Sequence, residues 1–349
     1  MRLSRRVREF EPYRAARHEA ARGILLDANE NPEGGLHEPP DLAQVLADLG
    51  RYPDPANLRV RDAAARALGV PVEAVFAGNG SDEAIDLLLR SLADPGDEVV
   101  IAAPTYGMYA VLAALHGLRA RVVRLDRDFR LDPEALEGAE DGRASALFLC
   151  SPNNPTGNLL GRTRILEAAR RFPGAVIVDE AYVEFAEVES LALEAARPGS
   201  SLIVLRTLSK AWGMAGLRCG FAVADPGLVE VLQSVKLPYN LSGVASALAA
   251  RALADPRRLE STVRRNATER ARLAEGLRAL GLAPLPSAAN FLLVPHAGAT
   301  SIVRRLARER GVVVRDRSNL PGIPAAFRVT VGTAMENDAF LEGLAQCLA

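Results

Sequence analysis

The chain has 349 residues, of which 49% are hydrophobic and 24% are charged, and its formal net charge is −1. This length is enough for two domains with a sizeable core, and the nearly neutral charge argues against binding to nucleic acid or to a membrane surface. The three cysteines (Cys150, Cys219 and Cys347) and the four histidines are widely spaced, which is typical of a reducing compartment and argues against disulfides or a zinc site.

The first 47 residues predict an arm followed by a connecting segment. Arginines are frequent at its start, and the segment is broken at 31–35 and at Pro39-Pro40. It contains no apolar run like a secretion signal, and no run in the sequence reaches the ~18–20 apolar residues that a membrane span needs. We therefore expect a cytoplasmic protein whose arm is solvated or faces a partner, rather than an arm that binds nucleic acid.

Short apolar strands alternate with helices from residue 48 to residue 243. A helix is predicted at 59–68, ending at Gly69, and a glycine turn leads into another helix at 84–92. Further strands are predicted at 99–103, 120–125, 146–150, 175–178, 201–206 and 219–223, with helices at 106–115 and 163–171. Such alternation implies right-handed crossovers and a mostly parallel sheet covered on both faces, in a large domain spanning 48–243.

After Pro238 the pattern changes to two long helical segments rich in alanine and arginine. These segments are 242–254 and 257–280, and alternation then resumes with strands at 290–294, 312–314 and 327–331 and helices at 302–310 and from 336. We expect a second, smaller α/β domain over 244–349, completed by part of the N-terminal segment 1–47.

The stretch from Thr207 to Arg218 is the first candidate for chemistry. It follows the predicted strand 201–206 and holds Lys210 among small residues. A lysine at the end of a strand is partly desolvated, so its amine loses its proton more easily and can bond to a carbonyl carbon. The stretch fits a solvated surface lysine equally well.

Asp179 is the second candidate, because it ends the apolar run 175–178. An ionised carboxylate buried there needs a cationic partner or a proton. The protonated ring nitrogen of a pyridine cofactor would serve as that partner. A helix cap or a structural salt bridge is the alternative.

Three further motifs lie at predicted strand ends, where ligands of parallel sheets bind. The segment 78–82 opens a helix whose free N–H groups suit a phosphate, although Ser81 or Asp82 fits a simple helix cap. The segment 151–157 is typical of a turn. Tyr106 follows another strand and suits either stacking on a planar cofactor or packing in the core.

Together these motifs resemble the fold-type I pyridoxal-phosphate aminotransferases. Asn-Pro-Thr-Gly at 154–157, Asp-x-Ala-Tyr at 179–182 and Ser-Lys-x-x-Gly-x-x-Gly-x-Arg at 209–218 occur in family order and near family spacing, and the similarity covers essentially the whole chain. The resemblance implies pyridoxal 5'-phosphate as cofactor. It also implies an α/β fold with a mostly parallel seven-stranded sheet in the large domain.

The resemblance assigns a role to each matching residue. Lys210 would bond the cofactor and later move the proton, and Asp179 would pair with the ring nitrogen. Asn154 and Tyr182 would bond to the phenolic oxygen, and Tyr106 would stack on the ring. The residues that would hold the cofactor phosphate are Ser81, Asp82, Thr207, Ser209 and Arg218.

A narrower resemblance is to the histidinol-phosphate aminotransferases. Their early signature matches 26–32, with Asp27 where many members have asparagine and with Asn29 as a substrate-binding residue. The segment 51–55 matches the one whose tyrosine, here Tyr52, reaches the cofactor phosphate of the neighbouring subunit. The residues that match the substrate-anion contacts are Tyr13, from the arm, together with Arg315 and Arg328.

This resemblance implies an enzyme that interconverts histidinol phosphate plus 2-oxoglutarate with imidazole-acetol phosphate plus glutamate. One site must then accept a phosphate and a carboxylate in turn, and guanidinium forks bind both anions. A homodimer with shared active sites is expected, because Tyr52 and Tyr13 would come from the other subunit.

Three alternatives remain open. An aromatic amino-acid aminotransferase shares most of the cofactor motifs, and a threonine-phosphate decarboxylase also binds a phosphorylated substrate. A non-catalytic ligand sensor of the same fold is the third, and it is disfavoured because no catalytic position is missing.

Overall fold

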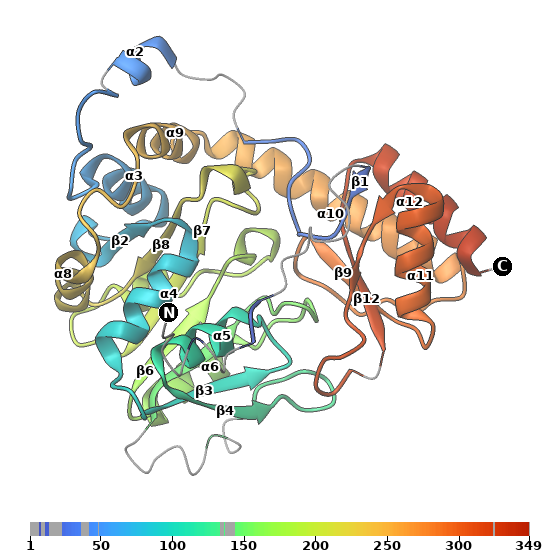
Figure 1. Cartoon of the computed structure of the whole chain (residues 1–349), viewed down its shortest axis with the longest axis horizontal. Helices are drawn as coiled ribbons and strands as arrows, with labels where there is room; N and C mark the ends of the chain where they lie inside the picture. Colours follow the sequence, from blue (N-terminus) through green and yellow to red (C-terminus); the bar gives the residue numbers. More distant parts are fainter. Residues whose placement is uncertain are drawn as a thin grey trace.

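The computed structural model describes residues 7, 11–13, 23–35, 42–47, 49–132, 136, 144–323 and 325–348. Figure 1 shows a larger part built around one sheet and a smaller part that contains the C-terminus. The helix α10 (Pro256–Ala279) runs from the larger part toward the smaller one. None of the helices in the described part of the chain is long and apolar enough to cross a lipid bilayer.

The larger part contains a seven-stranded sheet in the order β2-β8-β7-β6-β5-β3-β4. Neighbouring strands from β7 to β4 are parallel, whereas β8 is antiparallel to β7 and β2. The strands are β2 (Val75–Gly78), β3 (Glu98–Ala103), β4 (Arg119–Arg124), β5 (Ala144–Cys150), β6 (Ala175–Asp179), β7 (Leu202–Thr207) and β8 (Gly220–Val223). The predicted mostly parallel, seven-stranded sheet is confirmed.

Helices cover both faces of this sheet, which explains the continuous apolar runs of its central strands. In β6, Val176 and Val178 point into one core, whereas Ile177 points into the other. The first core receives α3 (Leu58–Leu68), α6 (Arg162–Arg171), α7 (Ala192–Ala195) and α9 (Gly243–Leu253). The second receives α4 (Gly80–Leu92), α5 (Met108–His116) and α8 (Pro226–Val235).

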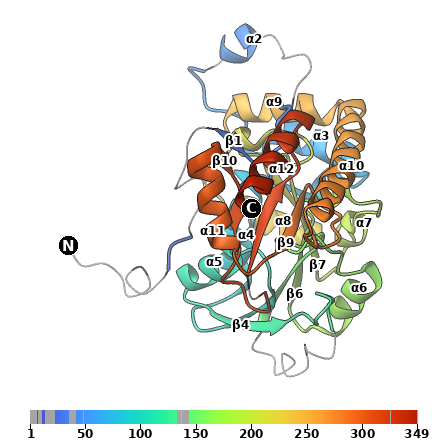
Figure 2. The ribbon, with the colours of Figure 1, turned by 90° about the vertical axis from the view of Figure 1, so that its right-hand side faces the viewer.

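The smaller part combines segments from both ends of the chain (Figures 1 and 2). Its antiparallel sheet has the order β11-β12-β9, and β1 pairs in parallel with β10. The elements are β1 (Ile24–Leu25), β9 (Phe291–Pro295), α11 (Ala299–Arg305), β10 (Val312–Val313), β11 (Arg315–Asp316), β12 (Ala326–Thr330) and α12 (Ala334–Leu348). The N-terminal segment therefore completes the smaller part, as predicted, while the domain boundaries at 47 and 243 stay predictions.

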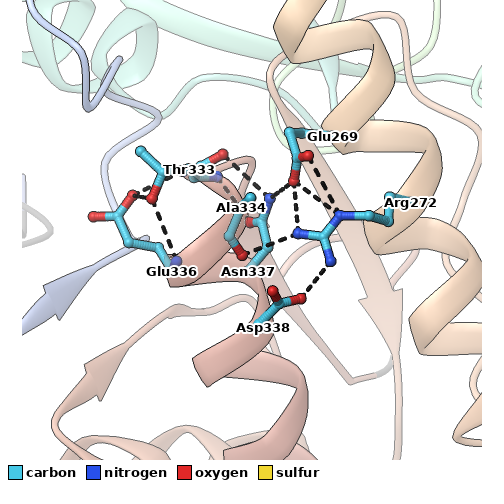
Figure 3. A network of polar contacts seen from close by, with 8 residues as sticks. Glu269, Arg272, Thr333, Ala334, Glu336, Asn337 and Asp338 are labelled. Atoms are coloured by element: carbon cyan, nitrogen blue, oxygen red, sulfur yellow. Dashed lines mark hydrogen bonds and ion pairs between the residues drawn. The ribbon is translucent and has the colours of Figure 1, made fainter.

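A polar network joins α10 to the start of α12 (Figure 3). Asn337 Nδ2 donates to Glu269 Oε2 at 2.8 Å, and Arg272 binds the carboxylates of Glu269 and Asp338. Thr333 and Glu336 form a capping box, in which the Thr333 N–H donates to Glu336 Oε2 at 2.8 Å. This network fixes the turn that follows β12 against α10.

The predicted elements agree with the structure except at their ends, and some elements were not predicted. These are the strand β2, the helices α2 (Leu42–Ala47), α7 and α8, and the short strands β1 and β11. The predicted helix 302–310 begins at Ala299 and finishes as a π-helical turn, Leu306–Arg310. The arginines at the start of the arm lie outside the described residues.

Candidate active site

A cavity of about 420 Å³ opens where the larger sheet faces the smaller one. The last residues of three neighbouring parallel strands line it, namely Cys150 of β5, Asp179 of β6 and Thr207 of β7. Arg315 of β11 and Arg328 of β12 line it from the smaller part. The fold thus places the cavity at the carboxyl ends of parallel strands, where α/β sheets bind ligands.

Fourteen of the fifteen predicted site residues line this cavity. They are Tyr13, Asn29, Ser81, Asp82, Tyr106, Asn154, Asp179, Tyr182, Thr207, Ser209, Lys210, Arg218, Arg315 and Arg328. The exception is Tyr52, whose ring is 81% exposed and stacks on Tyr239 with 4.6 Å between ring centroids.

The position of Tyr13 differs from the predicted one. We expected it to come from the other subunit, yet it lines the cavity of its own chain. Its ring lies edge-to-face with Tyr106, with 5.9 Å between centroids, and it packs beside Gly107. The prediction of a shared site therefore depends on Tyr52 and not on Tyr13.

Lys210 lies three residues beyond the end of β7 and points into the cavity. Its Nζ donates to the carbonyl oxygen of Ala28 at 2.9 Å and lies 5.7 Å from the ring centroid of Tyr182. Burial, reinforced by Arg328, lowers the pKa of Lys210 to about 8. Roughly a tenth of the amine is therefore neutral at pH 7, far more than at the ordinary pKa of lysine, and a neutral amine is the nucleophilic form.

Asp179 is buried at the base of the cavity, with 4% exposure. Its Oδ2 accepts from the Tyr109 hydroxyl at 2.7 Å, and its Oδ1 accepts from the Ala181 N–H at 3.0 Å. Burial raises the pKa of Asp179 to about 6, against the opposing effect of these hydrogen bonds. Within the described residues Asp179 forms no salt bridge, so the carboxylate suits a cationic group placed in the cavity.

Tyr109 was not predicted as a site residue. It is fully buried, stacks on Phe148 with 4.7 Å between ring centroids and holds Asp179 from below. The available signal was its position in the first turn of α5, three residues after the predicted Tyr106.

An anion cradle lies at the start of α4. Arg218 has a left-handed backbone (φ 54°), and its Nη1 donates to Ser209 Oγ at 3.4 Å. Ser209 Oγ lies 3.0 Å from Thr207 Oγ1, and Ser81 lies in the first turn of α4. Gly80 has φ 75°, and a Cβ there would lie 2.7 Å from Arg218 Nη2. Hydroxyl groups, a guanidinium and a helix N-terminus together are the groups that bind phosphates in proteins.

Asp82 turns its carboxylate toward the same side of the cavity. Its Oδ2 pairs with Arg218 Nη2 at 3.4 Å, and its Oδ1 accepts from the Tyr106 hydroxyl at 3.3 Å. This pair joins α4 to the loop after β7 and to the aromatic ring of Tyr106.

A second polar cluster faces the cavity from the smaller part. The buried Arg328 donates to Asn154 Oδ1 at 2.5 Å and to the carbonyl oxygen of Asp27 at 2.6 Å. Asn29, with φ 52°, donates from Nδ2 to the Tyr182 hydroxyl at 3.0 Å. The carboxylate oxygens of Asp27 are buried without a partner among the described residues, so Asp27 acts here through its main chain.

Comparison with known proteins agrees with this geometry. The model of the family "Aminotransferase class I and II" matches residues 21–344. A histidinol-phosphate aminotransferase of Parabacteroides distasonis is 40% identical, covering 97% of this chain and 95% of the relative. One of Roseiflexus castenholzii is 42% identical, covering 92% of this chain and 88% of the relative.

A solved structure has the same fold over nearly the full chain. The histidinol-phosphate aminotransferase of Sinorhizobium meliloti, in complex with pyridoxal-5'-phosphate, superposes with a TM-score of 0.88 and 27% identity, covering 99% of this chain and 97% of that one. The cofactor of the present chain is pyridoxal phosphate. The chain belongs to the class I and II aminotransferases and, within them, to the family of the histidinol-phosphate aminotransferases.

Proposed function

We propose that the chain transfers the amino group of L-histidinol phosphate to 2-oxoglutarate, giving imidazole-acetol phosphate and L-glutamate, as a step of histidine biosynthesis. The observation that carries this proposal is one cavity that joins a partly neutral lysine, a buried carboxylate, an anion cradle and further arginines on the opposite wall. The family to which the chain belongs supports the choice of substrate.

The residues of the cavity fit pyridoxal phosphate. The cradle of Ser81, Thr207, Ser209 and Arg218 suits its phosphate. Asp179, buried without a cationic partner among the described residues, suits a protonated ring nitrogen. When bound, this cofactor supplies an aldehyde carbon, which takes up the amino group between the two half-reactions, and a ring that withdraws electrons from the reacting carbon.

Lys210 would move the proton of the reaction. Its Nζ, held by the carbonyl oxygen of Ala28, can take a proton at the substrate carbon that bears the amino group and return it elsewhere. The lowered pKa of Lys210 raises the fraction of this amine that can accept a proton near neutral pH. Tyr109 would orient Asp179, and Asn29 would orient the Tyr182 hydroxyl.

Arg328 would bind the substrate anion nearest the reacting carbon. Its guanidinium is held by Asn154 and the Asp27 carbonyl, while its buried Nε has no hydrogen-bond partner among the described residues. A guanidinium fork accepts a carboxylate or a phosphate, so the same wall can serve both half-reactions.

We also propose a homodimer that works in the cytoplasm. Tyr52 and Tyr239 form an exposed aromatic pair outside the cavity of their own chain, and Leu237, two residues before Tyr239, is exposed as well. Exposed aromatic side chains are enriched in protein interfaces. Tyr52 would thus be free to reach the cofactor phosphate of a second copy.

The test is a panel of amino donors with 2-oxoglutarate as acceptor. We expect kcat/KM for histidinol phosphate to exceed that for phenylalanine by at least about tenfold, because a phosphate offers more charge and more acceptor oxygens to the arginines of this wall than a single carboxylate does. Glutamate formation is the measured quantity. A clear preference for phenylalanine would establish the aromatic aminotransferase instead, and carbon dioxide released from threonine phosphate would establish the decarboxylase.

A further inference from the structure

A second cavity, of about 360 Å³, shares a wall with the active site, because Glu30 lines both. Its other walls are one face of α10 and the turn between β12 and α12, which Figure 3 shows from close by. Phe185 and Val331 add apolar surface to this lining. A cavity of this size and mixed lining is typical of a site for a small organic molecule.

Three buried side-chain oxygens at this cavity have no hydrogen-bond partner among the described residues. They are Thr262 Oγ1, Asn266 Oδ1 and Asn290 Oδ1. Thr262 and Asn266 are four residues apart on α10 and so share a face, and Asn290 directly precedes β9. The exposed fraction is 5% for Thr262 and 1% for Asn290. Buried polar atoms are normally hydrogen-bonded, so these oxygens suit a ligand that donates N–H groups.

The charges around the cavity favour a cation over an anion. Arg265 pairs with Glu33, and Arg264 pairs with Glu260 at 3.7 Å, so both lining arginines already have a carboxylate partner. Carboxylates outnumber arginines in the lining, which contains Glu30, Glu33, Glu269, Arg264 and Arg265. A positively charged donor would therefore be stabilised there, whereas an anion would be repelled.

The wall between the two cavities is fixed by hydrogen bonds to the segment 28–31. Asn290 Nδ2 donates to the main-chain oxygen of Asn29 at 3.1 Å, which leaves the oxygen of the same amide as an unused acceptor. Asn31 Nδ2 donates to the carbonyl oxygen of Ala211 at 3.3 Å. A ligand in the second cavity would thus contact this segment without entering the site of the cofactor.

We infer that the second cavity binds a small organic cation that carries several N–H groups on a compact apolar body, such as an amine, an amidine or a guanidine. Its N–H groups donate to the oxygens of Thr262, Asn266 and Asn290, and its apolar body packs on Phe185 and Val331. This site is separate from the active site and takes no part in amino transfer. Binding there does not depend on which amino donor the enzyme uses.

The test measures the binding of benzamidine to the cofactor-loaded enzyme by calorimetry. We expect one site for each chain, with a dissociation constant of about 1 mM or tighter. Asn266→Leu should weaken binding at least about tenfold, because it removes an acceptor from the cavity. Asn266→Asp should tighten binding about three- to tenfold, because it replaces that acceptor with a charged one. Thr262→Val, which removes only the hydroxyl, should weaken it about threefold or more.

Glu275→Gln is the control, because it removes a charge from an exposed position of α10 outside the cavity and should leave the affinity unchanged. All four variants should keep the rate of glutamate formation within about threefold, which shows that they are folded. The inference is overturned if benzamidine does not bind to the wild-type enzyme at millimolar concentrations. It is also overturned if Asn266→Leu and Asn266→Asp bind equally well, or if benzamidine competes with glutamate for the active site.

Discussion

Lys210→Arg is expected to lose transamination by at least about 10³-fold. Arginine keeps the positive charge and most of the length of the side chain, but its guanidinium does not lose its proton in proteins. It can therefore neither bond to a carbonyl carbon nor accept the proton of the reaction, which lysine at this position can do with its lowered pKa of about 8. The measurement is the initial rate of glutamate formation with saturating cofactor.

The sequence supplies a matched control for this variant. It contains two lysines, Lys210 and Lys236, so Lys236→Arg tests the same chemical change elsewhere. Lys236 is also buried, and its Nζ donates to the carbonyl oxygen of Leu237 at 3.4 Å, outside the cavity. We expect Lys236→Arg to keep the wild-type rate within about threefold. More than a few per cent of activity in Lys210→Arg would contradict the role given to Lys210.

Asp179→Asn is expected to lower kcat/KM by about 10³-fold. Asparagine has the same shape but no charge, and removing one partner of a buried ion pair costs about 3–5 kcal/mol, with about 1.4 kcal/mol for each tenfold. Tyr109→Phe should cost less, about tenfold, because it removes one hydrogen bond of 2.7 Å and leaves the carboxylate in place. The two variants should therefore rank in that order.

The pH dependence of cofactor binding is a second test of the role of the Asp179 carboxylate. The raised pKa of Asp179 means that the group is ionised above about pH 6 and protonated below it in the free protein. The neutral acid cannot pair with a cationic ring nitrogen, so the affinity for pyridoxal phosphate should fall as the pH drops below 6. Asp179→Asn should bind weakly without this dependence, and full affinity of Asp179→Asn at pH 7 would refute the pairing.

The larger sheet was predictable because its strands are short apolar runs between clear helix signals. In the run 175–178 every side chain is buried or nearly so, which is the pattern of a central parallel strand. The strand β2 was missed because its four residues, Val75–Gly78, merge into the glycine turn. The strand β11 was missed because its two residues, Arg315 and Asp316, are charged and adopt their conformation through pairing with β12.

The chemical roles of the site residues were predictable where a motif directly follows a predicted strand. Contacts between distant segments were not, because local sequence does not encode them. Asn29 meets Tyr182 across 153 positions, and Asn154 meets Arg328 across 174. The position of Tyr13 in the cavity of its own chain is another contact between distant segments that the sequence did not predict.

Tyr109 and Arg317 are two residues at the site that the sequence did not predict. Each lies close in the sequence to a predicted residue, since Tyr109 follows Tyr106 by three positions and Arg317 follows Arg315 by two. Spacing does not reveal that Tyr109 meets Asp179, because that contact crosses from α5 to the end of β6. That Arg317 lines the cavity with Arg315 and Arg328 emerges only once the chain is folded.

Every role proposed for this cavity depends on Lys210 being the amine that bonds the cofactor. The most direct measurement is to reduce the cofactor-loaded protein with borohydride, which makes the lysine–cofactor bond permanent, and to locate the added mass by peptide mass spectrometry. We predict one phosphopyridoxyl group for each chain, on Lys210. The same group on Lys236, or an active protein that carries no such group, would contradict the assignment.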